Sequence, residues 1–206
     1  MKGLIFLPDY SYENSAKEKG FKYVCGVDEA GRGPLAGPVC AAAVILPDDV
    51  EIAGLNDSKK LSEKKREELY DIIVNKAVSY CVAYGTLEEI EKYNILEATF
   101  FAMNRAIAGL SITPDYALID GNRVPRDIKT PCETVVKGDS KSASIAAASI
   151  LAKVTRDRLL IEYDKKYPQY NFKKHKGYGT KEHYEAIKEY GVCEVHRLSF
   201  LKNVIK

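Results

Sequence analysis

No apolar run in the 206-residue sequence approaches the length of a membrane span. The first ten residues, MKGLIFLPDY, hold only a short apolar stretch that Pro8 and Asp9 interrupt, too brief for the core of a secretion signal. Internal repeats and low-complexity tracts are also missing. With 46% hydrophobic and 29% charged residues, the sequence predicts an ordinary globular protein that resides in the cytoplasm and has no membrane partner.

Cysteine and histidine are too few or too scattered for the common sites built from them. The five cysteines are odd in number and lie mostly in apolar runs, which argues against a disulfide framework and predicts reduced core residues. Cys193 and His196 form one close pair, without the second pair that a structural zinc site needs. No GxSxG motif supports a serine nucleophile. The three histidines are expected at the surface or in packing, with a phosphate contact left open for His175.

Positive and negative charges nearly cancel, since 31 basic residues oppose 29 acidic ones and leave a net charge of +2. Affinity for nucleic acid must therefore come from local clusters rather than from a global field. Two clusters exist, KKLSEKKR at 59–66 and KKHKGYGTK at 173–181, and the second interleaves Tyr178 with two glycines. A solvated helix start explains the first cluster more simply.

The order of apolar runs, cap residues and turn residues predicts an α/β domain, a mixed sheet with helices on its faces. The first two strands are expected to form a hairpin. Small residues at the start of the longest helix allow it to pack closely against the sheet. Strands are predicted at 21–27, 39–46, 79–85, 116–120 and 133–137, and helices at 62–76, 88–109 with a restart at Asn94, 141–166 and 181–190.

Acidic residues gather at the predicted strand ends. Asp28 and Glu29 close the first strand, Asp120 closes the fourth, and Asp139 lies in the turn before the longest helix. If the first and fourth strands are parallel neighbours, Asp28 and Asp120 meet, and like charges that close repel unless a cation lies among them. Oxygen ligands without Cys or His favour Mg²⁺ or Mn²⁺. The alternative, for each acid taken alone, is a solvated turn residue.

The stretch GRGPLAG at 31–37 allows another interpretation, a dinucleotide-binding turn with glycines at 31, 33 and 37. That motif needs a helix to follow, whereas Pro34, Pro38 and a β-like run follow here. The adjoining acidic pair would also repel phosphate if no metal were present. Both observations disfavour the dinucleotide interpretation.

Five stretches are specific in combination: DEAGRGPLAGPV at 28–39, NDSKKLS at 56–62, LIDGN at 118–122, KGDSKSASIAAASILAKVTRD at 137–157 and KGYGTKEH at 176–183. In order and spacing they resemble ribonuclease HII, the prokaryotic type 2 ribonuclease H, from residue 21 to about 200. The resemblance implies a ribonuclease H-like fold, a mixed five-stranded sheet flanked by helices with a C-terminal helical extension. It implies three parts, an N-terminal extension (1–20), a catalytic core (21–166) and a C-terminal substrate-binding portion (167–206).

The resemblance also implies an activity, endonucleolytic cleavage of RNA in RNA/DNA hybrids and at single ribonucleotides embedded in duplex DNA. The cut falls 5′ of the ribonucleotide and leaves a 3′-hydroxyl and a 5′-phosphate. Two Mn²⁺ or Mg²⁺ ions assist the hydrolysis in such a mechanism. The 2′-hydroxyl is then a recognition handle rather than the nucleophile.

Carried over residue by residue, the family's catalytic and metal-binding acids are Asp28, Glu29, Asp120 and Asp139. Asp157 is not among them, and we expect it to pair with Arg156 or Arg158 or to be solvated. The family's contacts to the ribonucleotide fall on Gly31, Arg32, Gly33 and Tyr178, and glycine there lets backbone atoms approach the sugar. Taken alone, Tyr178 reads as a packing residue on a loop. Candidates for phosphate contacts are Lys59, Lys60, Lys141, Lys174 and Lys176.

Two other functions remain open from the sequence. A binding module that kept the fold and lost the chemistry would have little use for four intact acids. A nuclease specific for DNA, such as a junction resolvase, would need no sensor for a 2′-hydroxyl, so Tyr178 and the Gly31–Gly33 turn disfavour it. The sequence shows no obvious oligomer seam, which predicts a monomer.

Overall fold

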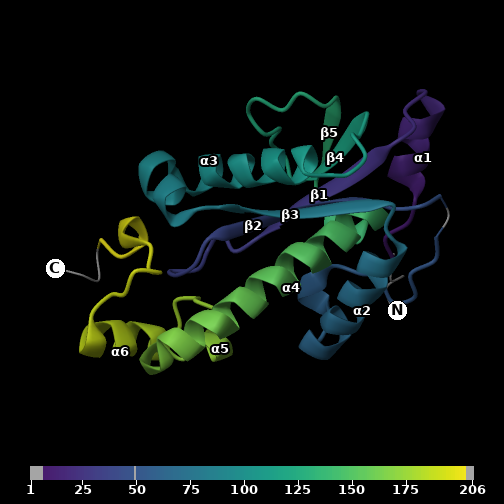
Figure 1. Ribbon diagram of the computed structural model, residues 1–206. Helices are drawn as coiled ribbons and strands as arrows, with labels where there is room; N and C mark the ends of the chain where they lie inside the picture. Colours follow the sequence, from purple (N-terminus) through teal and green to yellow (C-terminus); the bar gives the residue numbers. More distant parts are fainter. Residues whose placement is uncertain (1–6, 49, 203–206) are drawn as a thin grey trace, which may run out of the picture.

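A mixed five-stranded sheet forms the centre of the molecule, in the strand order 3-2-1-4-5 (Figure 1). The computed structural model describes residues 7–48 and 50–202. Its strands are β1 (Val24–Ala30), β2 (Val39–Ile45), β3 (Ser79–Gly85), β4 (Tyr116–Asp120) and β5 (Cys132–Val135). β1 pairs antiparallel with β2 and parallel with β4, so the expected hairpin and the expected neighbours are both present.

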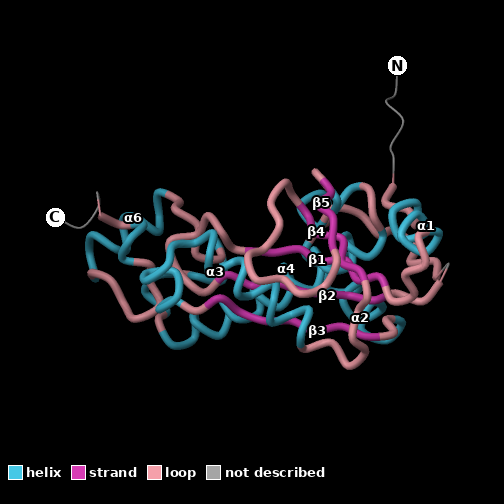
Figure 2. The backbone as a smooth tube through the Cα atoms, turned by 90° about the horizontal axis from the view of Figure 1, so that it is seen from above, coloured by secondary structure: helices cyan, strands magenta, loops and turns pink. Residues whose placement is uncertain are grey.

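Helices cover both faces of this sheet, which confirms the fold class predicted from the sequence. The helices are α1 (Ser11–Glu18), α2 (Glu63–Lys76), α3 (Leu87–Ala108), α4 (Ala143–Lys166), α5 (Phe172–His175) and α6 (Lys181–Tyr190). α3 lies on one face, while α4 crosses the other face and carries α2 beside it (Figure 1). Seen from above, α1 and α6 lie at opposite ends of the molecule (Figure 2). Within the described residues, no helix combines the length and the apolar character needed to cross a membrane.

α4 packs very closely against β1. A Cβ atom built on Gly26 would lie 2.2 Å from the backbone carbon of Ser144. Alanines at 143, 146 and 147 line the same face of α4 and are buried. The predicted close packing through small residues is therefore confirmed, and it lets the first turn of α4 lie directly against the strand that carries Asp28 and Glu29.

Side-chain caps define where the helices begin. Ser62 accepts a hydrogen bond from the Lys65 amide at the start of α2, as predicted. Asn94, with φ 75°, interrupts α3, and its Oδ1 accepts from the amides of Leu96 and Glu97. The expected restart at Asn94 is thus a true break in the helical backbone. Gly191 ends α6 with φ 76°.

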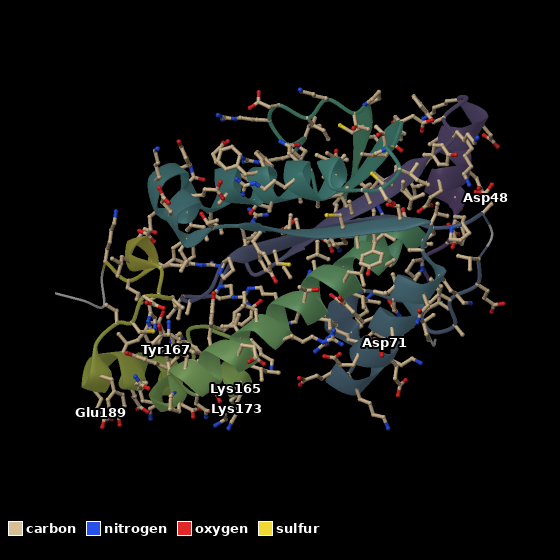
Figure 3. All side chains as sticks on the ribbon, in the orientation of Figure 1. Asp48, Asp71, Lys165, Tyr167, Lys173 and Glu189 are labelled. Atoms are coloured by element: carbon tan, nitrogen blue, oxygen red, sulfur yellow. The ribbon has the colours of Figure 1, made fainter. Side chains whose placement is uncertain are left out.

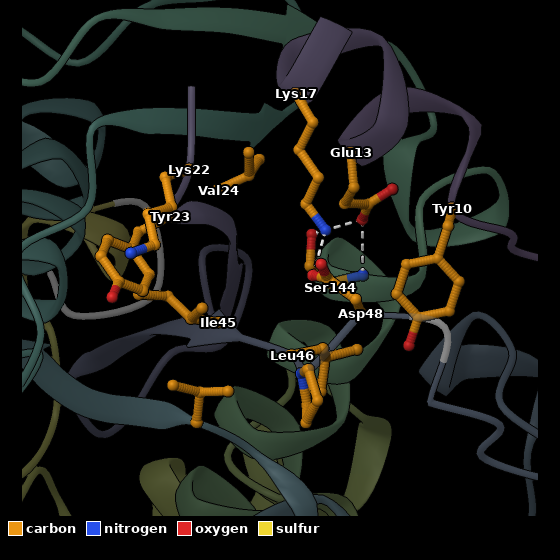
Figure 4. Close-up of a pocket in the computed structure, with 12 residues that line it drawn as sticks. Tyr10, Glu13, Lys17, Lys22, Tyr23, Val24, Ile45, Leu46, Asp48 and Ser144 are labelled. Atoms are coloured by element: carbon orange, nitrogen blue, oxygen red, sulfur yellow. Dashed lines mark hydrogen bonds and ion pairs between the residues drawn. The ribbon is translucent and has the colours of Figure 1, made fainter. Parts of the chain in front are cut away.

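The N-terminal segment is anchored to the beginning of α4, which the sequence did not predict. Glu13 of α1 is buried, and its Oε1 accepts a 2.6 Å hydrogen bond from the Ser142 hydroxyl. The same oxygen accepts a 2.9 Å hydrogen bond from the Ser144 amide (Figure 4). Asp9 forms a parallel bridge with Ser142. A carboxylate at a helix N-terminus is favoured by the exposed amides and by the helix dipole. Residues 9–18 therefore fasten the turn from which α4 starts.

The C-terminal segment packs around the turn between β1 and β2. Leu35 and Ala36 of this turn share a buried cluster with Leu160 of α4, Phe172 of α5 and Ile187 of α6. Leu35 donates its amide hydrogen bond to the carbonyl of Gly177, and Gly37 donates to that of Val195. The two segments that the sequence suggested for substrate recognition, near residues 31–33 and 178, are thereby built into one unit.

Replacing Gly26 with Ala is expected to lower the free energy of unfolding by about 1–3 kcal/mol, because the new methyl group overlaps the α4 backbone. Urea unfolding measures this change. Gly20→Ala is the comparison, since Gly20 has φ 97° but no atom within 4 Å of the added carbon. It isolates conformational strain of about 1 kcal/mol. Equal losses in the two variants would contradict the proposed overlap at Gly26.

Candidate active site

The four predicted acids lie at one edge of the sheet. The parallel ladder of β1 and β4 pairs Val27 with Ile119, and Asp28 and Asp120 are the next residue of each strand. Glu29 follows on β1, and Asp139 lies in a short 3₁₀ turn (Gly138–Ser140) before α4. Asp120 Oδ1 accepts a 2.6 Å hydrogen bond from the Gly138 amide, which ties the end of β4 to the turn that carries Asp139. The structure thus brings all four together.

Burial and mutual repulsion disfavour the charged forms of these acids. Burial raises the pKa of Asp28 well above its usual range, and the charges of Glu29, Asp120 and Asp139 raise it further. Burial also raises the pKa of Glu29, against the attraction of Arg32. For Asp139, burial and then Asp120 act in the same direction on the pKa. A cation among these groups would relieve the repulsion.

Lys59 supplies part of that positive charge. Its Nζ lies 3.7 Å from Asp139 Oδ2. Burial lowers the pKa of Lys59, but Asp28, Asp139 and other nearby acids outweigh this effect and raise the pKa overall. The negative potential of the acids therefore attracts the Lys59 ammonium group, as it would attract a divalent cation at this edge.

The four carboxylates fit a hard divalent cation whose remaining ligands come from water and from the substrate of the protein. All the candidate ligands are carboxylate oxygens, which suit Mg²⁺ or Mn²⁺ and not zinc. In the part of the chain that the structure describes, no three Asp, Glu, His or Cys side chains are gathered closely enough to enclose an ion by themselves. Mg²⁺ is usually held by one or two carboxylates together with water and substrate phosphates rather than by an all-protein cage. An open set of acids is consistent with that mode.

Two cavities adjoin the acids and share Glu29 and Arg32. The first, of about 230 Å³, is lined on one side by Gly31–Gly33 and on the other by Lys59, Lys153 and Tyr178. A Cβ atom on Gly33 would lie 3.8 Å from the Tyr178 ring, so the glycine turn and the exposed tyrosine face each other. The second cavity, of about 390 Å³, lies towards α3 and includes Asp120, Asn122 and Arg123. Gly31, Arg32, Gly33 and Tyr178 thus lie together beside Glu29.

Comparison with known proteins identifies the family. The sequence model of Ribonuclease HII matches residues 25–203. This chain belongs to the ribonuclease HII family. It is 56% identical over 194 residues to ribonuclease HII of Clostridioides difficile (strain 630), an alignment that covers 94% of this chain and 76% of that one. Membership in the ribonuclease HII family supports an endonuclease activity of the ribonuclease H type.

Solved structures agree with this assignment. Ribonuclease H2 from Pyrococcus horikoshii OT3 superimposes with a TM-score of 0.74 at 27% identity, covering 89% of this chain and 97% of that one. Bst-RNase HIII, whose structure was solved in complex with Mn²⁺, superimposes with a TM-score of 0.68 at 18% identity, over 89% of this chain and 69% of that one. At that identity the second likeness shows a shared fold alone.

The five predicted phosphate-binding lysines are not equivalent in the ribonuclease HII fold seen here. Lys59 lines the first cavity, whereas Lys60 and Lys141 are exposed beside the acid edge in the turns that carry Lys59 and Asp139. Lys174 pairs with Glu182 at 2.7 Å, and Lys176 lies 3.5 Å from Glu63. Figure 3 shows Lys165 and Lys173 at the end of the molecule formed by α4, α5 and α6, far from Asp48.

The expected partners of Asp157 were wrong. Asp157 is buried and pairs with Lys153, at 2.7 Å, because residues four apart share one face of α4. Arg156 points elsewhere and donates to backbone carbonyls, while Arg158 pairs with Glu67. Lys153, which the sequence analysis passed over, is thereby held at the wall of the first cavity.

The three histidines form one buried cluster near Tyr178, which confirms packing roles. His183 Nδ1 lies 2.9 Å from the Tyr178 carbonyl oxygen, so this nitrogen is the donor and Nε2 is an acceptor. His196 Nε2 then donates to His183 Nε2 at 3.1 Å, and His196 Nδ1 accepts from the Cys193 amide. His175 is buried too, with Nε2 2.8 Å from the Tyr170 carbonyl oxygen. The hydrogen bonds of His183 and His196 require neutral rings.

Replacing Asp28 with Asn is expected to stabilise the protein by about 1–2 kcal/mol in the presence of a chelator. The amide keeps the oxygen that accepts from the Glu29 amide at 2.7 Å but removes a buried, repelled charge. Urea unfolding in EDTA at pH 8 measures the change. Asp71→Asn, on the exposed surface of α2 (Figure 3), is the matched control and is expected to have no effect. A destabilised Asp28→Asn variant would argue against repulsion at this edge.

Acidification from pH 6.5 to 5 is expected to destabilise the protein through the histidine cluster. Burial lowers the pKa of His183 to about 4, so between that value and the unfolded value near 6.5 only the unfolded chain binds the proton. Stability then falls with pH by up to about 1.4 kcal/mol per unit for each such histidine. Burial lowers the pKa of His196 as well, so His196 acts in the same direction.

Urea unfolding of the wild-type chain and of His183→Gln between pH 7 and 5 tests this expectation. The buried acids, whose pKa values are raised, act in the opposite sense, so the difference between the two proteins isolates the contribution of His183. We expect a shallower pH dependence in the variant. Identical slopes would contradict a neutral, buried His183.

Proposed function

We propose that the chain cleaves RNA in RNA/DNA hybrids and at single ribonucleotides embedded in duplex DNA. It cuts on the 5′ side of the ribonucleotide and leaves a 3′-hydroxyl and a 5′-phosphate. One observation carries the proposal: four carboxylates from separate parts of the chain meet beside a cavity walled by Gly31–Gly33 and Tyr178. Membership in the ribonuclease HII family supports the substrate class.

Asp28, Glu29, Asp120 and Asp139 are the groups that would hold two Mg²⁺ or Mn²⁺ ions. When bound, such ions supply an activated water and stabilise the leaving oxygen of the phosphodiester. The protein's own part is to keep the four carboxylates at one edge, to bury Asp28 and Asp139, and to leave the open side towards the substrate phosphate. Lys59 Nζ lies 3.7 Å from Asp139 Oδ2, and with the acids neutralised by bound ions it would be available to contact the substrate phosphate.

Substrate recognition is divided between the sugar and the phosphates. The Gly31–Gly33 turn and Tyr178 face the sugar of the ribonucleotide, with the tyrosine ring stacked on it. Lys60, Lys141, Lys174 and Lys176 contact phosphates along the duplex, and the C-terminal portion from residue 167 contributes two of them. A monomer that resides in the cytoplasm remains a prediction from the sequence.

Two rival functions are less consistent with this geometry. A binding module without chemistry gains nothing from buried acids whose pKa values are raised by one another. A DNA-specific nuclease needs no cavity between a glycine turn and an exposed tyrosine. The dinucleotide-binding interpretation is wrong, because strand β2 and not a helix follows the glycine turn.

Cleavage of a labelled DNA duplex that contains one ribonucleotide, in Mg²⁺ or Mn²⁺, tests the proposal against an all-DNA duplex. Cleavage of the first alone, with a 3′-hydroxyl at the cut, is the expected result. Asp120→Asn is expected to reduce turnover by at least a thousandfold while binding of the duplex is retained, because the amide provides no anionic ligand. Asp71→Asn should cleave normally. Near-normal turnover by Asp120→Asn, or cutting of the all-DNA duplex, would refute the assignment.

A further inference from the structure

Arg197 is a buried cation whose hydrogen bonds all go to the backbone of one turn. Its side chain has no exposed surface, and no carboxylate lies within salt-bridge distance of it in the described residues. The guanidinium donates to the carbonyl oxygens of Gly31 (2.6 Å), Arg32 (2.9 Å), Pro34 (2.8 Å) and Gly37 (2.8 Å). Burying a charge without a counter-ion is unfavourable unless its hydrogen bonds are made, so this set of carbonyls must stay in place.

The direction of these carbonyls fixes the direction of the amides that follow them. A trans peptide bond is planar, so its N–H points opposite to its C=O, and no described peptide bond is cis. The Gly31 and Arg32 carbonyls point to Arg197, and therefore the amides of Arg32 and Gly33 point away from it. Neither amide donates a hydrogen bond within the described part of the protein. Both residues line the cavity that also contains Tyr178.

A second buried arginine joins this turn to the segment that carries Tyr178. Arg156 of α4 donates to the carbonyls of Ala36 (2.9 Å), Pro38 (3.1 Å) and Lys176 (3.0 Å). Its side chain also fills the space beside Gly31, where a Cβ atom would lie 1.9 Å from its Nε. Arg156 thus sets the spacing between the turn and the tyrosine segment, while Arg197 sets the direction of the peptide groups within the turn.

We propose that Arg197 is a positioning residue for ribonucleotide selectivity: it presents the amides of Arg32 and Gly33 to an oxygen of the ribose. The inference rests on the proposed function, since the ribose comes from that substrate class. Arg197 does not touch the substrate and acts through the turn. Two preset donors beside Tyr178 distinguish a sugar that bears a 2′-hydroxyl from one that lacks it, because the deoxy sugar leaves both donors unpaired.

The experiment compares binding of a duplex with one ribonucleotide and of the same duplex made only of DNA. Both affinities are measured in the Asp120→Asn background, where cleavage is prevented. Arg197→Lys keeps the positive charge but cannot donate to four separate carbonyls. We expect it to reduce affinity for the ribonucleotide duplex at least tenfold and affinity for the all-DNA duplex less than twofold. Mn²⁺ binding by calorimetry, measured in the otherwise wild-type chain, should be unchanged.

Arg105→Lys is the matched control. Arg105 donates to the carbonyl of Tyr84 and pairs with Glu89, away from the Gly31–Gly33 turn, so the ratio of the two affinities should not change. An unchanged ratio of the two affinities in Arg197→Lys, whether or not both affinities fall, would overturn the positioning role.

Thermal unfolding shows whether each variant is folded. If Arg197→Lys is unfolded, Arg197→Gln, which keeps two donors, replaces it. Failure of both to fold would assign Arg197 to overall folding and also overturn the proposal.

The two proposals fail in different ways. If the starting Asp120→Asn protein does not prefer the ribonucleotide duplex, the proposed substrate is wrong and Arg197 has no selectivity to control. If that protein shows the preference and Arg197→Lys retains it, the substrate stands and the inference about Arg197 falls.

Discussion

The parallel pairing of β1 with β4 is the constraint on which the site depends. It places Asp28 beside Asp120 although burial and repulsion raise the pKa of Asp28 well above its usual range. Acids free to move would separate. They are held because the same strand packs through Gly26 against α4, and because Glu13 fastens the turn from which α4 starts. Strain of this kind persists at functional sites when the surrounding structure over-determines it.

The acids at the end of β1 and β4 and the arginines around the glycine turn differ in how their buried charges are satisfied. At the acid edge, the carboxylates repel one another, with the exposed Lys59 as a counter-ion of Asp139. Around the glycine turn, two buried guanidinium groups, Arg156 and Arg197, are satisfied by backbone carbonyls alone. Burial lowers the pKa of Arg197 to about 9. The first arrangement favours binding of cations, whereas the second fixes a shape, and a fixed shape is what recognition of a neutral hydroxyl requires.

Local signals made the strands, the caps and the four acids predictable. Asn94 was identified as a helix restart because its side chain is suited to capping. Asp28 and Asp120 were identified because the sequence pattern placed both at the ends of strands in one sheet. Asp120 does end β4, whereas β1 continues past Asp28 to Ala30. Arg197, Glu13 and Lys153 were missed because their roles depend on burial against distant segments. Arg197 lies more than 160 positions from three of the four carbonyls it binds, namely Gly31, Arg32 and Pro34. An arginine between His196 and Leu198 gives no sign in the sequence that it is fully buried.

Arg32 joins the acids to the glycine turn. Arg32 extends from the glycine turn to within 3.3 Å of Glu29, and both residues line both cavities beside the acids. Its backbone carbonyl binds Arg197, so one residue contacts the acid edge through its side chain and the positioning network through its main chain. A change in the charge near Glu29 can therefore move the Arg32 side chain without moving the Arg32 peptide groups. Under the proposed function, this separation lets the four acids adjust to a substrate phosphate while the amides of Arg32 and Gly33 stay fixed.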